Sequence, residues 1–343
     1  FHPLTLLTSY VLISIVNTFS FLFSFGVLAV WIGIISLLSM ELFLVFTFLI
    51  KLKYQNWKLT HRFLGLSFIL ASIHVMLIQS DTKTDLFLRI YMIIFIIIGL
   101  ASFIYRTLLW KKLVKQHDYF ISEIKKLGDN ITELTLSSKN EKSHISFIPG
   151  QFAFLSIESK LISNEQHPFT ISSSPAEPVL RFLIKNLGDF TSKISQLKKG
   201  TKVKLEGPYG RFCFSKAKYK SQIWIAGGIG ITPFLSQARS MKYKEHYGNF
   251  TKIDFYYSVN EESEVIFQKE LETIKIRNNN FKVIPFISSK QGHLTAEIIS
   301  KQSKIMNRDI FICGPKPMMF SLKKEFIKMG IPNSRIHTEE FEL

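Results

Sequence analysis

Cysteine is scarce in this chain, and its scarcity excludes two kinds of architecture. The 343 residues contain only Cys213 and Cys313, too few for a fold stapled by several disulfides. Their spacing also matches no zinc-ligand motif. We predict no disulfide, and we expect Cys213 to be a small packing residue of a strand.

Charge is nearly absent from two long stretches in the first third of the chain. Residues 26–50 contain one charged side chain, Glu41, and residues 86–109 contain two arginines. Each stretch exceeds the ~20 residues that an apolar helix needs to cross a bilayer. A third span is expected over residues 61–79. Residues 3–25 are also apolar, and because hydrophobic stretches follow one another, we expect the chain to begin inside an earlier membrane helix rather than with a cleaved signal peptide.

Lysine and arginine gather on one side of these spans. They are concentrated in residues 51–62 and 106–115, whereas residues 80–85 hold one lysine and two aspartates. Since basic residues accumulate on cytoplasmic loops, the second part of the chain is predicted to lie in the cytoplasm. With its apolar spans, the chain is expected to be an integral membrane protein, of a bacterial inner membrane. The formal charge of +17 is interpreted as favouring attraction to anionic lipid. A nucleic-acid partner is not expected, because the sequence has no basic motif interleaved with aromatic residues.

Histidines within the apolar segments are candidate metal ligands. His61 and His74 lie thirteen positions apart on one expected helix, which separates them by about 20 Å along its axis. Because imidazole is a common axial ligand of haem iron, we predict that both bind haem and that His2 faces His74. Their side chains lie about 140° apart on an ideal helix, which a bend near Gly65 would have to correct. The alternative is that His61 lies at the membrane interface while His74 hydrogen-bonds a neighbouring helix.

Two soluble domains are expected after the helices. Short alternating strands separated by Pro-Gly and Lys-Gly turns indicate an antiparallel β-barrel; they are expected at residues 131–136, 145–147, 151–155, 181–184 and 201–205. Strands expected at residues 253–258, 282–287 and 309–313 then alternate with helices, as in a doubly wound parallel sheet. The sequence therefore predicts an all-α transmembrane helical bundle over residues 1–115, the β-barrel over 116–216, and an α/β domain with a parallel sheet over 217–343.

A glycine-rich turn follows the apolar strand expected at residues 222–226. Gly227, Gly228 and Gly230 precede a helix start, where Thr232 is predicted to be the N-cap and Pro233 the first helical residue. Such a turn lets a pyrophosphate approach the backbone and the helix N-terminus. The usual Gly-x-Gly-x-x-Gly fingerprint is absent, so a purely structural turn is the alternative.

Four short strings occur in a fixed order in the second part of the chain. They are HPFTIS at residues 167–172, GPYG at 207–210, GGIGITP at 227–233 and CGP at 313–315. Together they resemble the ferredoxin–NADP reductase superfamily, in the version used by NADPH oxidases and ferric reductases. The resemblance covers nearly the whole chain. It implies a membrane oxidoreductase that passes electrons from NAD(P)H through FAD and haem b to ferric iron or O2 across the membrane.

The resemblance also implies roles for individual residues in flavin binding. Phe169 packs against the isoalloxazine, the Thr170 hydroxyl bonds the ring, and His167 lies near the ribityl phosphate. The other implied flavin-binding residues are Pro168, Ser172, Gly188, Asp189, Thr191, Gly207, Tyr209 and Gly210. A turn capped by Thr191 is the alternative for the Gly188 segment.

The resemblance also implies that the nicotinamide nucleotide is bound by the turn at residues 227–233 together with Cys313 and Gly314. For Cys313, the alternative is a buried cysteine that only packs. The implied catalytic residues are Thr170, Cys313 and Phe341, the last of which covers the flavin. Asn260 stands where similar proteins often carry an arginine suited to the 2′-phosphate of NADPH. The choice between NADH and NADPH is therefore open.

Two other functions remain compatible with the sequence. One is a haem-free, membrane-anchored flavin reductase that feeds quinone or a partner protein, and the other is a non-enzymatic electron-conduit or assembly subunit. The expected partners are the lipid bilayer and a small-molecule electron acceptor. Whether the chain forms a homo-oligomer or joins a second membrane subunit stays open.

Overall fold

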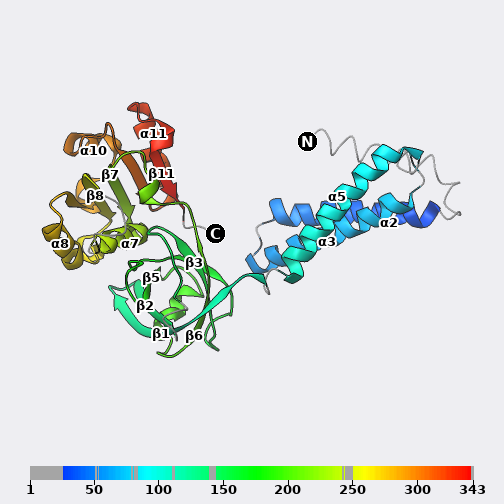
Figure 1. The fold of residues 1–343 in the computed structure, drawn as a ribbon, viewed down its shortest axis with the longest axis horizontal. Helices are drawn as coiled ribbons and strands as arrows, with labels where there is room; N and C mark the ends of the chain where they lie inside the picture. The colour runs from blue at the N-terminus through cyan, green and yellow to red at the C-terminus, as the bar shows by residue number, and fades with distance from the viewer. Residues whose placement is uncertain are drawn as a thin grey trace. The chain divides into compact units, whose positions relative to one another are not determined.

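The chain divides into two compact units, Phe1–Val114 and Lys115–Leu343. The computed structural model describes residues 26–50, 52, 54–78, 80, 84–109, 113–138, 144–241, 243 and 250–340 (Figure 1). Two predicted site residues, His2 and Phe341, lie outside the described residues.

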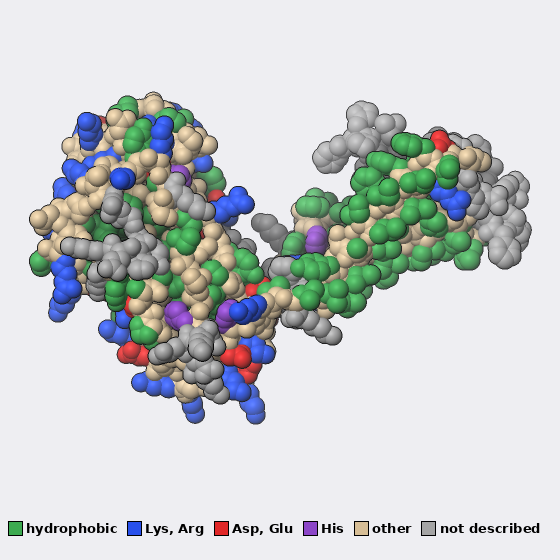
Figure 2. Space-filling model, in the orientation of Figure 1, with side chains coloured by type: hydrophobic (Ala, Val, Ile, Leu, Met, Phe, Trp, Pro, Cys, Tyr) green, Lys and Arg blue, Asp and Glu red, His purple; other side chains and the backbone are tan. Residues whose placement is uncertain are grey.

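Three long apolar helices form the described part of the first unit. They are α2 (Gly26–Phe48), α3 (Tyr54–Leu77) and α5 (Leu86–Ile104), which continues as the π-helical turn η1 (Tyr105–Leu109). Each is long and apolar enough to cross a membrane, and Figure 2 shows hydrophobic side chains over most of the visible face of this unit. The prediction of three apolar helices is confirmed. The second one begins at Tyr54 rather than near His61, because its polar first turns contain no helix breaker.

Small and hydroxyl side chains hold α2 against α3. The Ser36 hydroxyl donates to the Ser67 carbonyl at 2.8 Å, and the hydroxyls of Ser39 and Ser67 lie 2.8 Å apart. One end of this seam is closed by Phe43 and Phe63, whose rings stack with centroids 5.4 Å apart. Since lipid tails are as apolar as leucine, such close packing and interhelical hydrogen bonds are what associate helices in a bilayer.

An antiparallel sheet opens the second unit. Its strands are β1 (Gln116–Leu127), β2 (Ile131–Ser138), β3 (Phe152–Ile157), β4 (His167–Thr170), β5 (Leu180–Lys185) and β6 (Lys202–Tyr209). They are ordered β4-β3-β6-β1-β2-β5. The two edges meet through a bridge between Ile171 and Phe182, and the Ser172 amide donates to the Arg181 carbonyl at 2.8 Å. The sheet therefore curls around its buried core, and the expectation of an antiparallel sheet is confirmed.

Two local predictions for this sheet are wrong. Residues 145–147 form no strand, because the Ile145 amide donates to the Tyr119 hydroxyl and the Ile148 amide to the Gln151 side chain, so side chains replace a ladder partner. Cys213 is buried, but it precedes the short 3-10 turn η4 (Phe214–Lys216) and lies outside any strand.

A five-stranded parallel sheet completes the second unit. Its strands, in the order β11-β10-β7-β8-β9, are β11 (Ile336–Glu339), β10 (Asp309–Cys313), β7 (Ser221–Gly227), β8 (Lys252–Val259) and β9 (Phe281–Ile287). Its helices are α7 (Thr232–Ser240), α8 (Gln268–Arg277), α9 (Ser288–Gln291), α10 (Ala296–Gln302) and α11 (Lys316–Lys328). Short 3-10 turns lie at η3 (Thr191–Gln196), η5 (Gly228–Ile231), η6 (Glu262–Glu264) and η7 (Asn333–Arg335).

Alternate residues of β7 explain why helices cover both faces of this sheet. Trp224 packs in one buried cluster with side chains of α7 and α8, whereas Ile223 and Ile225 pack in another with side chains of α10 and α11. The helices accordingly lie on opposite sides of the sheet (Figure 1). This is the doubly wound arrangement that the strand and helix alternation predicts.

Candidate flavin and nicotinamide nucleotide site

The two strings predicted to bind flavin meet on either side of β3. Phe152 pairs with Thr170 of β4 on one side and with Tyr209 of β6 on the other. The rings of Phe152, Phe154 and Tyr209 contact one another with centroids 5.7 to 6.0 Å apart. The fold therefore brings residues 167–170 and 207–210 together and sets an aromatic surface between them.

A second aromatic group links the flavin string to the segment at Gly188. The ring of His167 lies 3.8 Å from that of Phe190, and Phe169 stacks on Phe190 at 6.4 Å. The Nε2 atom of His167 is buried with no hydrogen-bond partner, and the Glu165 carboxylate is 3.7 Å away. Burial lowers the pKa of His167, so the ring is neutral at neutral pH. An orphaned ring nitrogen suits a hydroxyl or phosphate oxygen of a bound cofactor.

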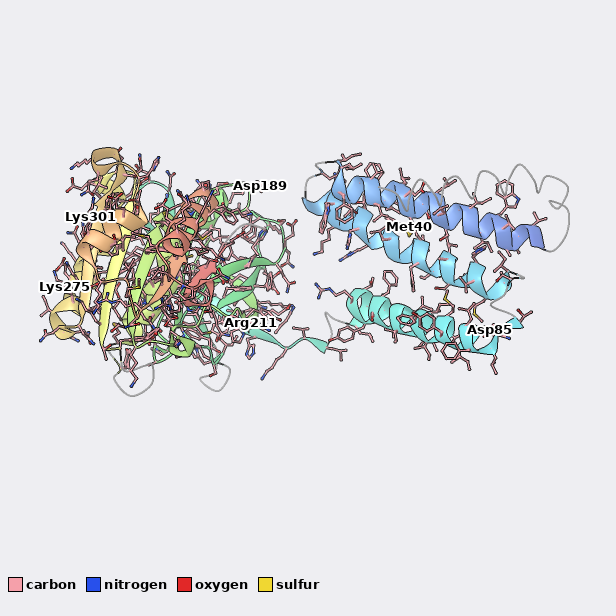
Figure 3. The ribbon with its side chains drawn as sticks, turned by 90° about the horizontal axis from the view of Figure 1, so that it is seen from above. Met40, Asp85, Asp189, Arg211, Lys275 and Lys301 are labelled. Atoms are coloured by element: carbon pink, nitrogen blue, oxygen red, sulfur yellow. The ribbon has the colours of Figure 1, made fainter. Side chains whose placement is uncertain are left out.

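The Gly188 segment forms a turn closed by its own side chains. The Thr191 hydroxyl accepts from the amides of Leu187 and Gly188 at 2.9 and 3.0 Å, and the Asp189 carboxylate accepts from the Phe190 amide. Asp189 itself is exposed at the surface (Figure 3). This is the capped turn described above as the alternative, and contact with a pyrophosphate stays a prediction.

The glycine turn after β7 differs from expectation at its end. Gly228 has φ +53°, and a Cβ there would meet nothing within 4 Å. The turn is a 3-10 helix that runs directly into α7, so Ile231 is the N-cap, without a side-chain cap bond. Thr232 lies inside the helix and its hydroxyl donates to the Ile229 carbonyl at 3.2 Å. The prediction of Thr232 as N-cap is wrong, because a continuous turn leaves no extended residue for that role, and Pro233 becomes the second helical residue.

This turn packs backbone to backbone against the Cys-Gly-Pro turn after β10. A Cβ on Gly230 would lie 2.2 Å from the Cys313 carbonyl oxygen, and one on Gly314 would lie 3.0 Å from the backbone of Gly227. Only glycine fits such an approach. Two strings more than eighty residues apart are thus brought together at the carboxyl ends of neighbouring parallel strands.

A cavity of about 510 Å³ opens beside these turns. Its wall combines Gly227 and Gly228 with Ser258 at the end of β8, Ser288 after β9 and Met318 of α11. This is the edge where parallel sheets bind nucleotides, and the volume suits a small molecule. Sequence reasoning missed Ser258 and Ser288, which the rule on strand ends would have found. It also missed wall residues with no sequence signal, namely Lys185, Glu264, His293 and Glu325.

Cys313 faces the interior rather than this cavity. Its side chain is fully buried, and its thiol lies 3.5 Å from the Glu339 carbonyl oxygen. Burial raises the pKa of the Cys313 thiol well above its usual value, and burial also raises the pKa of the Glu339 carboxyl. The thiol is therefore protonated, and its part in hydride transfer stays a prediction.

The two described histidines of the helical unit lie in different surroundings. His61 is exposed on α3 and stacks on Trp57 with centroids 5.1 Å apart. His74 lies between α2 and α3, with its Nδ1 atom 2.7 Å from the Ala29 carbonyl oxygen. The helix α3 is continuous through Gly65, where a Cβ would meet Phe103 of α5. The helix α3 therefore has no break or π-bulge at Gly65 that would bring His61 and His74 onto one face, and haem binding by both residues stays a prediction.

Comparison with known proteins agrees with the two soluble domains. The model of an FAD-binding domain matches residues 118–212, and that of an oxidoreductase NAD-binding domain matches residues 224–324. The matched models thus give an FAD-binding domain followed by an oxidoreductase NAD-binding domain, and the fold of the second unit is similar to that of solved ferredoxin reductases.

Three known proteins illustrate the similarity. Flavohemoprotein A of Dictyostelium discoideum is 27% identical over 62% of this chain and 57% of its own length. The toluate 1,2-dioxygenase electron transfer component of Pseudomonas putida is 26% identical over 64% of this chain and 66% of its own length. The chain thus spans less than two thirds of either relative. The flavohaem-like FAD/NAD-binding domain of a Vibrio cholerae nitric oxide dioxygenase is similar in fold, with a TM-score of 0.56 and 20% identity over 66% of this chain and 98% of that domain.

Proposed function

We propose that this chain is a membrane-bound reductase that passes electrons from cytosolic NAD(P)H through FAD to haem within the bilayer, and from there to a ferric chelate or O2. The proposal is carried by a combination of two observations. The FAD-binding and NAD-binding domains follow apolar helices. Among the described residues of these helices, His74 lies between two helices and has a free Nε2 atom. When bound, the flavin takes a hydride and haem iron takes single electrons, so together they connect a two-electron donor with a one-electron path.

His74 has the hydrogen bond that a metal-binding histidine needs. A carbonyl oxygen can only accept, so the contact with Ala29 requires the proton on Nδ1 and leaves the lone pair on Nε2. Histidines that bind metals almost always donate their other ring N–H in this way. The residues present therefore fit a haem group that His74 would hold through its Nε2 atom. His61, exposed on the same helix, has no such partner described.

In the module, the chain's own groups would hold and align the two nucleotides. The aromatic surface of Phe152 and Tyr209 beside Thr170 suits a flat ring, and the open N-terminal turn at Gly228 suits a pyrophosphate. No general base is required, because hydride transfer is the cofactors' chemistry and the protein sets distance and orientation.

A haem-free reductase is the second candidate. The relative from Pseudomonas putida is by its name an electron transfer component of a dioxygenase, which supports delivery to a partner protein. The bond between His74 and Ala29 also stabilises a helix pair without any metal.

Spectroscopy of the full chain in membranes distinguishes these candidates. We expect a Soret band that shifts when NADH or NADPH is added without oxygen, and its absence would refute the haem proposal. His74→Leu should remove the band while the flavin content and the reduction of soluble dyes by NADH persist. Ser72→Ala is a matched control on α3, because its hydroxyl bonds only its own helix at Phe68, and it should keep the band.

A further inference from the structure

A buried arginine joins the two nucleotide-binding domains. The side chain of Arg239, on α7, is 1% exposed. It donates from Nε and Nη2 to both carboxylate oxygens of Glu270, each at 2.9 Å, and from Nη2 to Glu133 at 3.2 Å. From Nη1 it donates to the Ser172 carbonyl at 2.9 Å. Glu270 belongs to the parallel-sheet domain, whereas Glu133 and Ser172 belong to the antiparallel sheet, so one guanidinium crosses the domain boundary.

Two serines extend this contact along the same face of α7. The Ser236 hydroxyl donates to the Ser173 carbonyl at 2.7 Å, and the Ser240 hydroxyl, which donates to the Ser236 carbonyl of its own helix, lies 3.2 Å from the Ser174 hydroxyl. Residues 236, 239 and 240 have the spacing of one helical face. The segment that receives them, Ser172–Ser174, is fully buried; it begins with the last residue of the string at residues 167–172.

The position of the guanidinium is itself tightly held. Phe267, which precedes α8, has φ +61°, an unusual conformation for a bulky residue, and its ring lies 5.1 Å from Cζ of Arg239. Burial lowers the pKa of Arg239, but the bonded Glu270 and the nearby Glu133 raise it more, so the group remains charged. A fixed, charged fork of this kind resists sliding or rotation of one domain on the other.

The two ends of α7 therefore contact different parts of the second unit. Its first turn follows the glycine turn beside the nucleotide cavity, and its last turns are bonded to the continuation of the flavin strand. We propose that Arg239, with Ser236 and Ser240, is a positioning latch that fixes the nicotinamide-binding helix on the flavin-binding sheet and so sets the alignment of the two rings for hydride transfer. The proposal rests on the flavin reductase half of the proposed function and is independent of haem.

The test compares Arg239→Lys with Arg308→Lys in the full chain. Arg308 is also buried and paired, with Asp254, but both residues lie within the parallel-sheet domain. Three quantities are measured: the FAD content, the limiting rate and nucleotide KM of anaerobic flavin reduction, and hydrogen exchange of residues 172–174 and 236–240.

We expect Arg239→Lys to keep its FAD and its KM while the limiting rate falls about tenfold or more, because a misalignment near 1 Å can cost ~100-fold. Exchange in both segments should rise. Arg308→Lys should lower the melting temperature and leave the limiting rate within about twofold of the parent. An unchanged rate in Arg239→Lys, or an equal loss in both variants, overturns the latch.

If Arg239→Lys cannot be obtained as a folded, FAD-containing protein, a milder variant tests the latch. Ser236→Ala removes one hydroxyl bond, and a lower limiting rate at full FAD content supports the latch, whereas a parental rate overturns it. If the parent itself fails to oxidise NADH or NADPH, the proposed function fails instead, and this outcome is distinct because it appears before any substitution.

Discussion

Gly230→Ala tests whether the close contact between the glycine turn at residues 227–233 and the Cys-Gly-Pro turn at residues 313–315 positions the nucleotide. The added Cβ would lie 2.2 Å from the Cys313 carbonyl oxygen, 2.5 Å from its carbonyl carbon and 2.8 Å from the Gly314 amide nitrogen. All three neighbours are backbone atoms and cannot rotate away. The turns must therefore separate by about 1 Å before ordinary contact is restored.

Two consequences follow from this separation. Overpacking of this size costs about 1–3 kcal/mol of folding free energy. If the turn aligns the nicotinamide nucleotide as proposed, a 1 Å displacement can also cost ~100-fold in rate. We therefore expect a modest loss of stability and a large loss in the limiting rate of flavin reduction by NADH or NADPH. Stopped-flow absorbance of the flavin and a thermal unfolding curve measure the two effects separately.

Gly330→Ala provides the matched control for the same substitution. Gly330 has φ +85° and open space around its Cα, so alanine there costs about 1–2 kcal/mol through backbone strain alone. It should destabilise the same domain without slowing flavin reduction. Parental kinetics in Gly230→Ala, or equal slowing in Gly330→Ala, would refute the reasoning.

Three further predictions address the nucleotide, the pH response and the membrane histidine. Asn260→Arg should raise kcat/KM for NADPH relative to NADH about tenfold or more, because Asn260 lines the cavity after β8; an unchanged ratio would place the ribose elsewhere. Burial lowers the pKa of both His144 and His167 below 6.5, so the folded state binds protons less readily than the unfolded state. The free energy of unfolding should therefore fall as the pH drops below about 6.5. In urea titrations, a variant with both histidines changed to Gln should show a weaker dependence of this free energy on pH. Gly33→Ala should reduce haem content, because its Cβ would lie 2.6 Å from the His74 ring, and a parental Soret band would contradict this.

The sequence was most informative where a local pattern decides the structure. The strand predicted at residues 309–313 is observed with the same ends, because a buried apolar run lies between a polar start and the turn at Gly314. The three apolar helices and the two sheets were likewise foreseen from composition and periodicity. The strings meet in two pairs: residues 167–170 and 207–210 lie on either side of β3, and the turns at residues 227–233 and 313–315 pack together because the carboxyl ends of parallel strands share an edge.

Errors arose where a distant side chain decides the structure. The stretch at residues 145–147 has a strand's composition, but the Tyr119 hydroxyl takes the backbone bond that a ladder would need. The 3-10 turn that displaces Thr232 from the N-cap packs at Gly230 against the end of β10, a contact between residues 83 positions apart. Arg239 was not foreseen at all, because its partners Glu133 and Ser172 lie 106 and 67 positions away and no short motif records such a contact.

The Arg239 guanidinium between the two domains limits where this chain can be divided to build chimeric proteins. A chimera that joined residues 1–216 to a second domain without an arginine at the position of Arg239 would leave Glu133, which is 7% exposed, without its counter-ion. An uncompensated buried charge is strongly destabilising, typically by about 3–5 kcal/mol. The boundary near residue 216 separates two folding patterns, but it is a poor place to exchange parts unless Arg239 and its acceptors are transplanted together.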